Sequence, residues 1–216
     1  MANVKLVWAT PDADKLVAYM ARVSAPNNQE NYATAPKLIG YLIKHRHWSP
    51  FEMVSACVEI ETTRDIGRQL LRHRSFSFQE FSQRYADPTK DLGFTTRGAR
   101  LQDHKNRQNS IEVDDPDLHD WWWRQHCGVC DVANAVYNEA IKRGVAKEVA
   151  RAVLPEGMTL SRLYMAGTLR SWLHFCDLRR GPETQKETRE IANEAWRILN
   201  DACPTIIEAW DKHHEH

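Results

Sequence analysis

The sequence predicts an α+β domain in which a small mixed or antiparallel sheet is packed by several helices, one of them long. Apolar and polar residues alternate along residues 54–61, and a period of two is typical of a strand with one buried face. Apolar residues recur at spacings of three and four along residues 117–143 and 183–202, which indicates two long helices. The 216 residues fit a single domain, 1–216, without an internal repeat or linker.

The first third of the chain carries a separate signal for each element. Thr10-Pro11-Asp12 supplies cap and first-turn chemistry for a helix. Ala35-Pro36 opens a second helix, since proline is tolerated in a first helical turn, and Ser49-Pro50 follows its exit. From residue 64, arginines at every fourth position would share one helical face. The elements expected here are a strand at 4–8, a helix to 21, a helix from 35 to about 45, a strand at 54–61 and a helix at 64–72.

The middle of the chain holds a long segment without a period. Residues 86–116 include Pro88, Gly93 and Gly98 among many polar residues, and we expect a long loop excursion there, either a functional cover or a disordered loop. The next 27 residues, 117–143, predict one long packed helix with a broad apolar surface. The elements expected after it are a short helix at 147–153, a strand at 159–165 and helices at 168–176 and 183–202.

The amino-acid composition indicates in which compartment the protein works and which kinds of partner it is not expected to bind. Lysine and arginine total 29, as do aspartate and glutamate, so no net charge would draw the protein to nucleic acid or anionic lipid. The five cysteines form an odd set without a pairing framework, which favours a reducing, cytoplasmic environment. No apolar run of about 18 residues and no signal segment occurs, so we expect neither a membrane span nor export.

Residues 72–85 are the most informative stretch of the chain. They concentrate three arginines, a histidine, a carboxylate and three serines among four aromatic residues. Guanidinium groups match phosphate oxygens, and aromatic faces stack on planar rings, so the stretch suits phosphorylated, ring-bearing ligands. Because the chain has no glycine-rich phosphate loop, arginine side chains would have to form the cradle. The arginines available are Arg64, Arg68, Arg72, Arg74, Arg84, Arg151, Arg170 and Arg179.

Each of these features also has a simpler interpretation. A single arginine is more often the surface partner of an acidic residue, but a crowd of arginines around Arg72 repels itself unless an anion is bound. Cys127 and Cys130 form a Cys-x-x-Cys pair, yet no second pair follows at zinc spacing, so we expect packing in the long helix and no metal. The terminal residues 213–216, His-His-Glu-His, are expected to form a solvated tail.

The same stretch resembles a known motif. Arg72-His73-Arg74 is followed after seven residues by Ser82 and then by Arg84-Tyr85, and this spacing is similar to the motif of the flavin-dependent thymidylate synthases. The likeness runs in the family's order from about residue 21 to residue 188. The other matching blocks are Ala21-Arg22-Val23-Ser24, His47-x-Ser49-Pro50-Phe51-Glu52, residues 150–155 and residues 168–179.

The resemblance implies the fold and the activity of that family. It implies an enzyme, a methyltransferase that converts dUMP to dTMP with FAD as cofactor and with 5,10-methylenetetrahydrofolate and NADPH as co-substrates. No cysteine nucleophile is needed in this scheme, and Cys176, in an apolar helix, is expected to be a packing residue. It also implies a homotetramer in which several subunits build each flavin site.

The resemblance assigns roles residue by residue. Arg179 is the catalytic candidate, because it would stabilise the uracil ring as an anion, and His47 would line the folate side of the active site. The residues implied for dUMP are Gln69, Arg72, Glu80, Ser82, Arg84, Arg151 and Arg179. The residues implied for FAD are Ser49, Arg72, His73, Arg74, Glu80, Thr168, Arg170 and His174.

Two other functions remain open at this stage. The arginine and aromatic residues of 72–85 could grip single-stranded nucleic acid, although zero net charge argues against this. A family member that binds nucleotide without turnover is the second alternative, and the presence of Arg84, Arg151 and Arg179 argues against it. The chain departs from the family pattern at Gln79, Met53 and Thr168, where Asn, His and Asn are usual.

Overall fold

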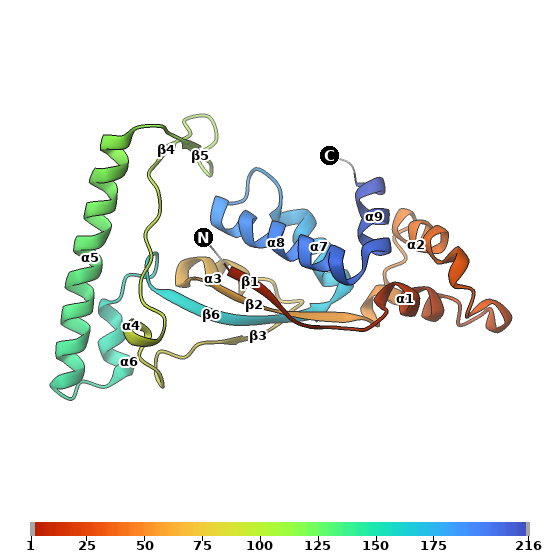
Figure 1. Cartoon of the computed structure of the whole chain (residues 1–216), viewed down its shortest axis with the longest axis horizontal. Coiled ribbons are helices and arrows are strands. Elements are labelled where there is room, and N and C mark those ends of the chain that lie inside the picture. Colours follow the sequence, from red (N-terminus) through yellow and green to blue (C-terminus); the bar gives the residue numbers. More distant parts are fainter. Residues whose placement is uncertain (1–2, 215–216) are drawn as a thin grey trace.

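The computed structural model describes residues 3–214, and it contains a four-stranded antiparallel sheet, a two-stranded hairpin and helices on one face and at both ends of the sheet (Figure 1). The strands are β1 (Asn3–Ala9), β2 (Ser55–Thr63), β3 (Ser77–Glu80), β4 (Arg100–Gln102), β5 (Ser110–Glu112) and β6 (Leu160–Thr168). The α-helices are α1 (Ala13–Ala21), α2 (Ala35–Lys44), α3 (Arg64–Leu70), α4 (Pro88–Asp91), α5 (Pro116–Lys142), α6 (Lys147–Ala150), α7 (Leu169–Arg179), α8 (Lys186–Ala202) and α9 (Pro204–His213).

The main sheet has the strand order β1-β2-β6-β3, and every neighbouring pair is antiparallel. In the central pair, Val58 lies opposite Met165 and Ile60 opposite Leu163, and all four side chains are buried. Glu59, the residue between them on β2, lies on the other face of the sheet and is only half-buried. The predicted half-buried strand at 54–61 is therefore confirmed, and the sheet is antiparallel rather than mixed.

The core lies between the sheet and helices α7 and α8, which cover one of its faces (Figure 1). Trp172 of α7 is fully buried there, and its Nε1 donates to Ala56 O of β2 at 3.1 Å. Its indole therefore fills the core without leaving a polar group unpaired. Helices α1, α2 and α9 extend this core at one end of the sheet (Figure 1). We call the sheet with α1–α3 and α7–α9 the body.

The long helix α5 stands at the opposite end of the sheet, with α4, α6 and the β4–β5 hairpin beside it (Figure 1). We call these four elements the arm. Its own core is small, because Tyr137, Ala150 and Leu154 form its only cluster of buried apolar residues within 3–214. The sequence predicted a packed helix, but Val132 of α5 is 65% exposed and Trp121 is also exposed. That prediction was wrong for this face, because periodicity shows an apolar surface and not what covers it.

Several elements differ from the sequence-based prediction. Strand β3 was not expected, and the excursion 86–116 contains α4 and the β4–β5 hairpin. Helix α3 ends at Leu70, so Arg72 does not continue the face of Arg64 and Arg68. At the C-terminus, residues 213 and 214 belong to the end of α9, where His214 stacks on Trp210 with 4.0 Å between ring centroids, so these two are not a free tail. Residues 215 and 216 lie outside the described part.

Candidate active site

The turn after α3 carries Arg72 and Arg74 to the surface. Phe76 anchors this turn in the body, because its ring packs edge-on against Trp172 with 4.8 Å between centroids. A Cβ placed on Gly167 of β6 would lie 2.5 Å from the Phe76 ring, so this position requires glycine. Arg72 and Arg74 are exposed, and in residues 3–214 neither guanidinium meets a carboxylate. Two permanently charged groups are thus held without a counter-ion.

His73 and Arg179 join this turn to helix α7. Arg179 Nε donates to His73 Nε2 at 2.9 Å, and the His73 ring packs edge-on against Phe175. Since a guanidinium only donates, His73 must be the acceptor, and its ring proton must lie on Nδ1. Burial, together with the charges of Arg179 and Arg72, lowers the pKa of His73 to about 4. The imidazole is therefore neutral near pH 7 and orients a cation.

Glu80, at the end of β3, is held from two sides. Its Oε1 accepts from Ser161 Oγ at 2.8 Å and from Arg64 Nη1 at 3.2 Å. Ser161 is buried and the Arg64 side chain is mostly buried, so the carboxylate has a fixed orientation. Glu80 Oε2 has no partner among the described residues and is free to accept from a ligand.

The amide of Gln69 is likewise fixed by residues from the C-terminal part of the chain. Gln69 Nε2 donates to Gln185 Oε1 at 2.7 Å, and Thr188 Oγ1 donates to Gln69 Oε1 at 2.8 Å. Thr188 is fully buried at the start of α8. The orientation of the Gln69 amide is set by these two bonds, and it retains one N–H for a ligand.

Arg84 and Arg151 converge on Glu148 at the base of the arm. Arg84 Nε lies 3.4 Å from Glu148 Oε2, and Arg151 Nε donates to Glu148 O at 3.3 Å. The backbone N–H of Arg84 donates to Ser82 Oγ at 3.4 Å, which holds that hydroxyl at the turn that carries Arg84. Because the side chains of Arg84 and Glu148 are more than half exposed, their ion pair contributes little, and a phosphate could replace it.

Glu52 organises a second group of the predicted residues. Thr168 Oγ1 donates to Glu52 Oε2 and Arg170 Nη1 donates to Glu52 Oε1, both at 2.7 Å. These hydrogen bonds lower the pKa of Glu52. Thr168 also caps helix α7 by accepting from Ser171 N, and Ser171 Oγ donates to Ser75 O in the motif turn. The start of α7 therefore connects Glu52 to the turn that carries Arg72 and Arg74.

His47 is placed by the end of helix α2. Arg46 has φ 57°, its N–H donates to Ile43 O, and His47 N donates to Leu42 O at 2.8 Å. This pair of bonds is the Schellman arrangement that closes a helix. It leaves His45 and His47 exposed, with 6.2 Å between their ring centroids.

Trp48 connects this corner to helix α7. Its ring packs edge-on against His174 with 4.9 Å between centroids, and burial lowers the pKa of His174. Ser49 follows in a 3₁₀ turn, Ser49–Glu52, that ends at the carboxylate holding Thr168 and Arg170. His47, Ser49 and His174 thus lie around one corner of the body.

The structure separates the predicted residues into linked groups. The motif turn, Arg179 and the Glu52 group are joined by hydrogen bonds, whereas Arg84 and Arg151 stand apart at the base of the arm. Arg64 and Arg68 were available arginines in the sequence, but they pair with Glu80 and Glu156. Five residues orient the predicted site residues, and the sequence did not indicate this role for any of them. Glu52 lies in a block that resembles the family, and Arg64 lies in the row of arginines from residue 64, but neither was expected to support the site. The supporting residues are Glu52, Arg64, Ser161, Gln185 and Thr188.

The arrangement is rich in cations and poor in metal ligands. Within residues 3–214, no three His, Cys, Asp or Glu side chains come together as a metal site. Nor does any helix in this range have the length and apolar character needed to cross a membrane. The cations Arg72, Arg74 and Arg179, of which Arg179 is held by His73, can bind anions and stabilise negative charge that develops on a ligand.

Comparison with known proteins agrees with this chemistry. Residues 5–205 match the family model described as thymidylate synthase complementing protein. The chain is 47% identical to a flavin-dependent thymidylate synthase of Synechocystis over 90% of this chain and 87% of that protein. It is 44% identical to a probable flavin-dependent thymidylate synthase of Paramecium bursaria Chlorella virus 1, over 92% and 91% of the two chains.

A solved structure has the same fold. The crystal structure of a UMP/dUMP methylase, PolB, from Streptomyces cacaoi bound with 5-Br UMP superposes with a TM-score of 0.85. The match covers 99% of this chain and 95% of that chain at 28% sequence identity. The same methylase bound with 5-Br dUMP gives a TM-score of 0.84.

Proposed function

The chain belongs to the family of flavin-dependent thymidylate synthases, and on this premise we propose that it methylates dUMP to dTMP, with FAD as cofactor, 5,10-methylenetetrahydrofolate as carbon donor and NADPH as reductant. The observation that carries the proposal is the turn at Arg72-His73-Arg74. It presents two guanidiniums without a counter-ion and fixes a third, Arg179, through the neutral His73. Such a group of cations is stable beside a bound anion.

The residues present fit FAD. A flavin dinucleotide carries a pyrophosphate, and the unpaired, exposed Arg72 and Arg74 suit that charge. Thr168 stands where asparagine is usual in the family, yet its hydroxyl still joins Glu52, so this departure keeps a polar group in place. When bound, FAD supplies hydride to the substrate and is recharged by NADPH. The residues that would hold it are Ser49, Arg72, His73, Arg74, Glu80, Thr168, Arg170 and His174.

The nucleotide phosphate fits the base of the arm. Arg84, Arg151 and the Ser82 hydroxyl would bind it, since both arginines contact Glu148, the Ser82 hydroxyl bonds the Arg84 backbone, and a phosphate can displace the weak Arg84–Glu148 ion pair. Gln69 and the free Oε2 of Glu80 would add fixed hydrogen-bonding groups, with Arg72 as a further cation. The methylase of similar fold was solved with brominated UMP and dUMP, which supports a uridine nucleotide as substrate.

Arg179 would activate the uracil. Its Nε is occupied by His73, while the two terminal nitrogens have no partner among the described residues and remain able to donate. Placed at the N3–C4 edge of the pyrimidine, they would stabilise the ring as N3 loses its proton. Arg179 is half-buried, and partial exclusion of water would strengthen this interaction. His47 would line the folate side of the site.

We further propose a homotetramer with shared sites. The exposed side of α5 carries Val129, Val132 and Val136 in a row, with 46% to 65% of each residue exposed. An apolar row of this kind is typical of an interface between subunits. The separation of Arg84 and Arg151 from the flavin residues also fits a site completed by a neighbouring copy.

The first test is anaerobic mixing of FAD-reconstituted protein with NADPH, with and without dUMP, while the oxidised flavin band is followed. We expect the protein to retain flavin and the band to bleach faster when dUMP is present. Addition of methylenetetrahydrofolate should then yield dTMP. Protein that retains no flavin, combined with strongly salt-dependent oligonucleotide binding, would instead favour the nucleic-acid alternative.

A further inference from the structure

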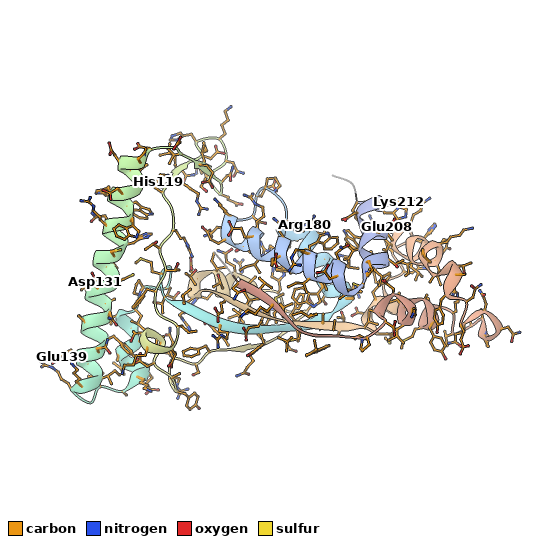
Figure 2. The ribbon with its side chains drawn as sticks, viewed as in Figure 1. His119, Asp131, Glu139, Arg180, Glu208 and Lys212 are labelled. Carbon is orange, nitrogen blue, oxygen red and sulfur yellow. The ribbon has the colours of Figure 1, made fainter. Side chains whose placement is uncertain are left out.

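A groove between helices α2 and α9 lies outside the residues assigned above. The two helices lie side by side at the end of the body opposite the arm (Figure 1). The cavity has a volume of about 530 Å³, within the usual range for small-molecule sites. Figure 2 shows Glu208 and Lys212 on α9, and the facing residues on α2 include Lys37, Tyr41 and Lys44.

The groove is cationic, and its charges are not neutralised. Lys37, Lys44 and Lys212 line it against a single carboxylate, Glu208. Among residues 3–214, none of the three lysines forms an ion pair. Lys37, Tyr41 and Lys44 follow at spacings of four and three, so the helix presents them on one face. Like charges gathered on one face are stabilised by a bound anion.

The groove continues directly into the active-site corner. Tyr41 and His45 line it with 4.3 Å between their ring centroids, and the Tyr41 ring lies 5.8 Å from the ring of His47. Tyr41 is 52% exposed, so a face remains open for another planar ring. A ligand that begins at His47 and runs along the groove would therefore meet the Tyr41–His45 pair, with Lys44 on the same stretch of α2, and then Lys37, one helical turn further from His47.

We propose that this groove binds the tail of the folate co-substrate: the p-aminobenzoyl ring against Tyr41 and His45, and the chain of glutamate carboxylates against Lys37, Lys44 and Lys212. The inference rests on the proposed function, because that function places the folate co-substrate beside His47. The folate carries an aromatic linker next to its carboxylates, and the groove likewise holds the aromatic pair Tyr41–His45 next to its lysines. Folates with longer glutamate chains bind more tightly, since each added carboxylate meets unpaired cations.

A direct binding experiment tests the groove without turnover. Calorimetry would measure binding of p-aminobenzoyl-pentaglutamate, which lacks the pteridine, to the FAD-loaded protein. Replacement of two groove lysines, Lys44→Gln with Lys212→Gln, should weaken binding roughly tenfold. The matched control, Lys5→Gln with Lys142→Gln, removes two exposed lysines from β1 and α5 and should leave binding unchanged. Equal binding in the groove variant and the wild type would overturn the proposal.

Steady-state kinetics separates the folate tail from the other anionic co-substrate. In the wild type, the KM for pentaglutamylated methylenetetrahydrofolate should be lower than for the monoglutamate, and the groove variant should lose this difference while the KM for dUMP is unchanged. A raised KM for NADPH alone would assign the groove to the dinucleotide phosphates and overturn the folate-tail proposal. Protein without turnover that still binds the probe through Lys44 and Lys212 would refute the proposed function and support the groove.

Discussion

The body and the arm use apolar residues in opposite ways. In the body, Trp172, Leu163 and Met165 are fully buried between sheet and helices. In the arm, α5 spans 27 residues but buries only His126, Ala133 and Tyr137. Helix propensity and an N-cap, Asp115, can hold the backbone of α5, but nothing within residues 3–214 covers its apolar row. The body therefore buries its apolar residues against its own elements, whereas the arm leaves an apolar row exposed.

The residues of the proposed site are also divided between the body and the base of the arm. Arg179 and the motif turn belong to the body, where packing holds them in fixed positions. Arg84 and Arg151 lie beside α6 at the base of the arm, where Arg84 is exposed and Arg151 is half-buried. In the proposed site, the body would position the group that activates the uracil, and the base of the arm would bind the dUMP phosphate. Substitutions in the two regions should therefore affect different measurements.

The largest effect is expected from Trp172→Ala in the body. Removal of a fully buried indole that also bonds Ala56 O should lower the free energy of unfolding by about 3–5 kcal/mol. Denaturant unfolding followed by circular dichroism measures this. The control is Trp123→Ala on the exposed side of α5, which should change stability by less than about 0.5 kcal/mol. A similar decrease in the free energy of unfolding in both variants would contradict the contrast between a packed body and an exposed face of α5.

The second prediction concerns the apolar row of the arm. Val132→Glu with Val136→Glu should leave the fold of the chain intact but weaken subunit association roughly a hundredfold or more, because unpaired carboxylates would be buried in the interface. Light scattering after size-exclusion chromatography measures the assembly. Ala135→Glu with Lys142→Glu adds two carboxylates to exposed positions of α5 outside the row and should preserve the assembly. An unchanged mass for the first variant would contradict a role of this row.

The third prediction separates body from arm in catalysis. Arg179→Ala should lower kcat roughly a hundredfold while flavin stays bound, because a charge that stabilises the ionised uracil is lost. Arg84→Ala should instead raise the KM for dUMP roughly tenfold with normal flavin content, because a phosphate contact is lost. Steady-state kinetics and the flavin absorbance measure these outcomes.

The neighbouring Arg180 supplies the control. Its guanidinium lies over Trp196, 4.6 Å from the ring centroid, rather than beside His73. Arg180→Ala should therefore keep kcat and the KM for dUMP. An unchanged dUMP affinity in Arg84→Ala would show that Arg84, at the base of the arm, does not bind the dUMP phosphate.

The smallest effect is expected from the pH dependence of stability. The unfolded chain protonates His73 near its ordinary pKa of 6.5, but the folded chain does so only near 4. The unfolded state thus binds more protons in this range, and the free energy of unfolding falls as the pH drops from 6.5 to 4. After allowance for solvent screening, His73 should account for about 1–2 kcal/mol.

Unfolding measured at pH 7.5 and at pH 4 would test this value. His73→Gln should show a smaller loss of stability between the two pH values than the wild type. The exposed His104, in the loop between β4 and β5, offers the control, and His104→Gln should keep the wild-type pH dependence. Identical pH dependence in all three proteins would show that burial beside Arg179 does not keep His73 neutral.

The sequence predicted elements well where their signals are local. Strand 54–61 and the long helix at 117–143 match β2 and α5 closely, since alternation and helical spacing lie within each segment. Strand β3 was missed because its residues Ser77, Gln79 and Glu80 carry no strand signal, and it forms only by pairing with β6, far along the chain. The residues of the excursion gave no period, so its hairpin also escaped prediction.

For the candidate site, the motif, the arginines available for binding and the family resemblance could be predicted from the sequence, because they depend only on residue type and spacing. The tertiary structure alone decided which arginines are free. Arg64 and Arg68 meet carboxylates 16 and 88 residues away, whereas Arg72 follows the end of α3 and meets none in the described chain. It likewise decided that the valines of α5 are exposed. Ion pairs and burial depend on contacts between distant segments, which helical or strand periodicity does not encode.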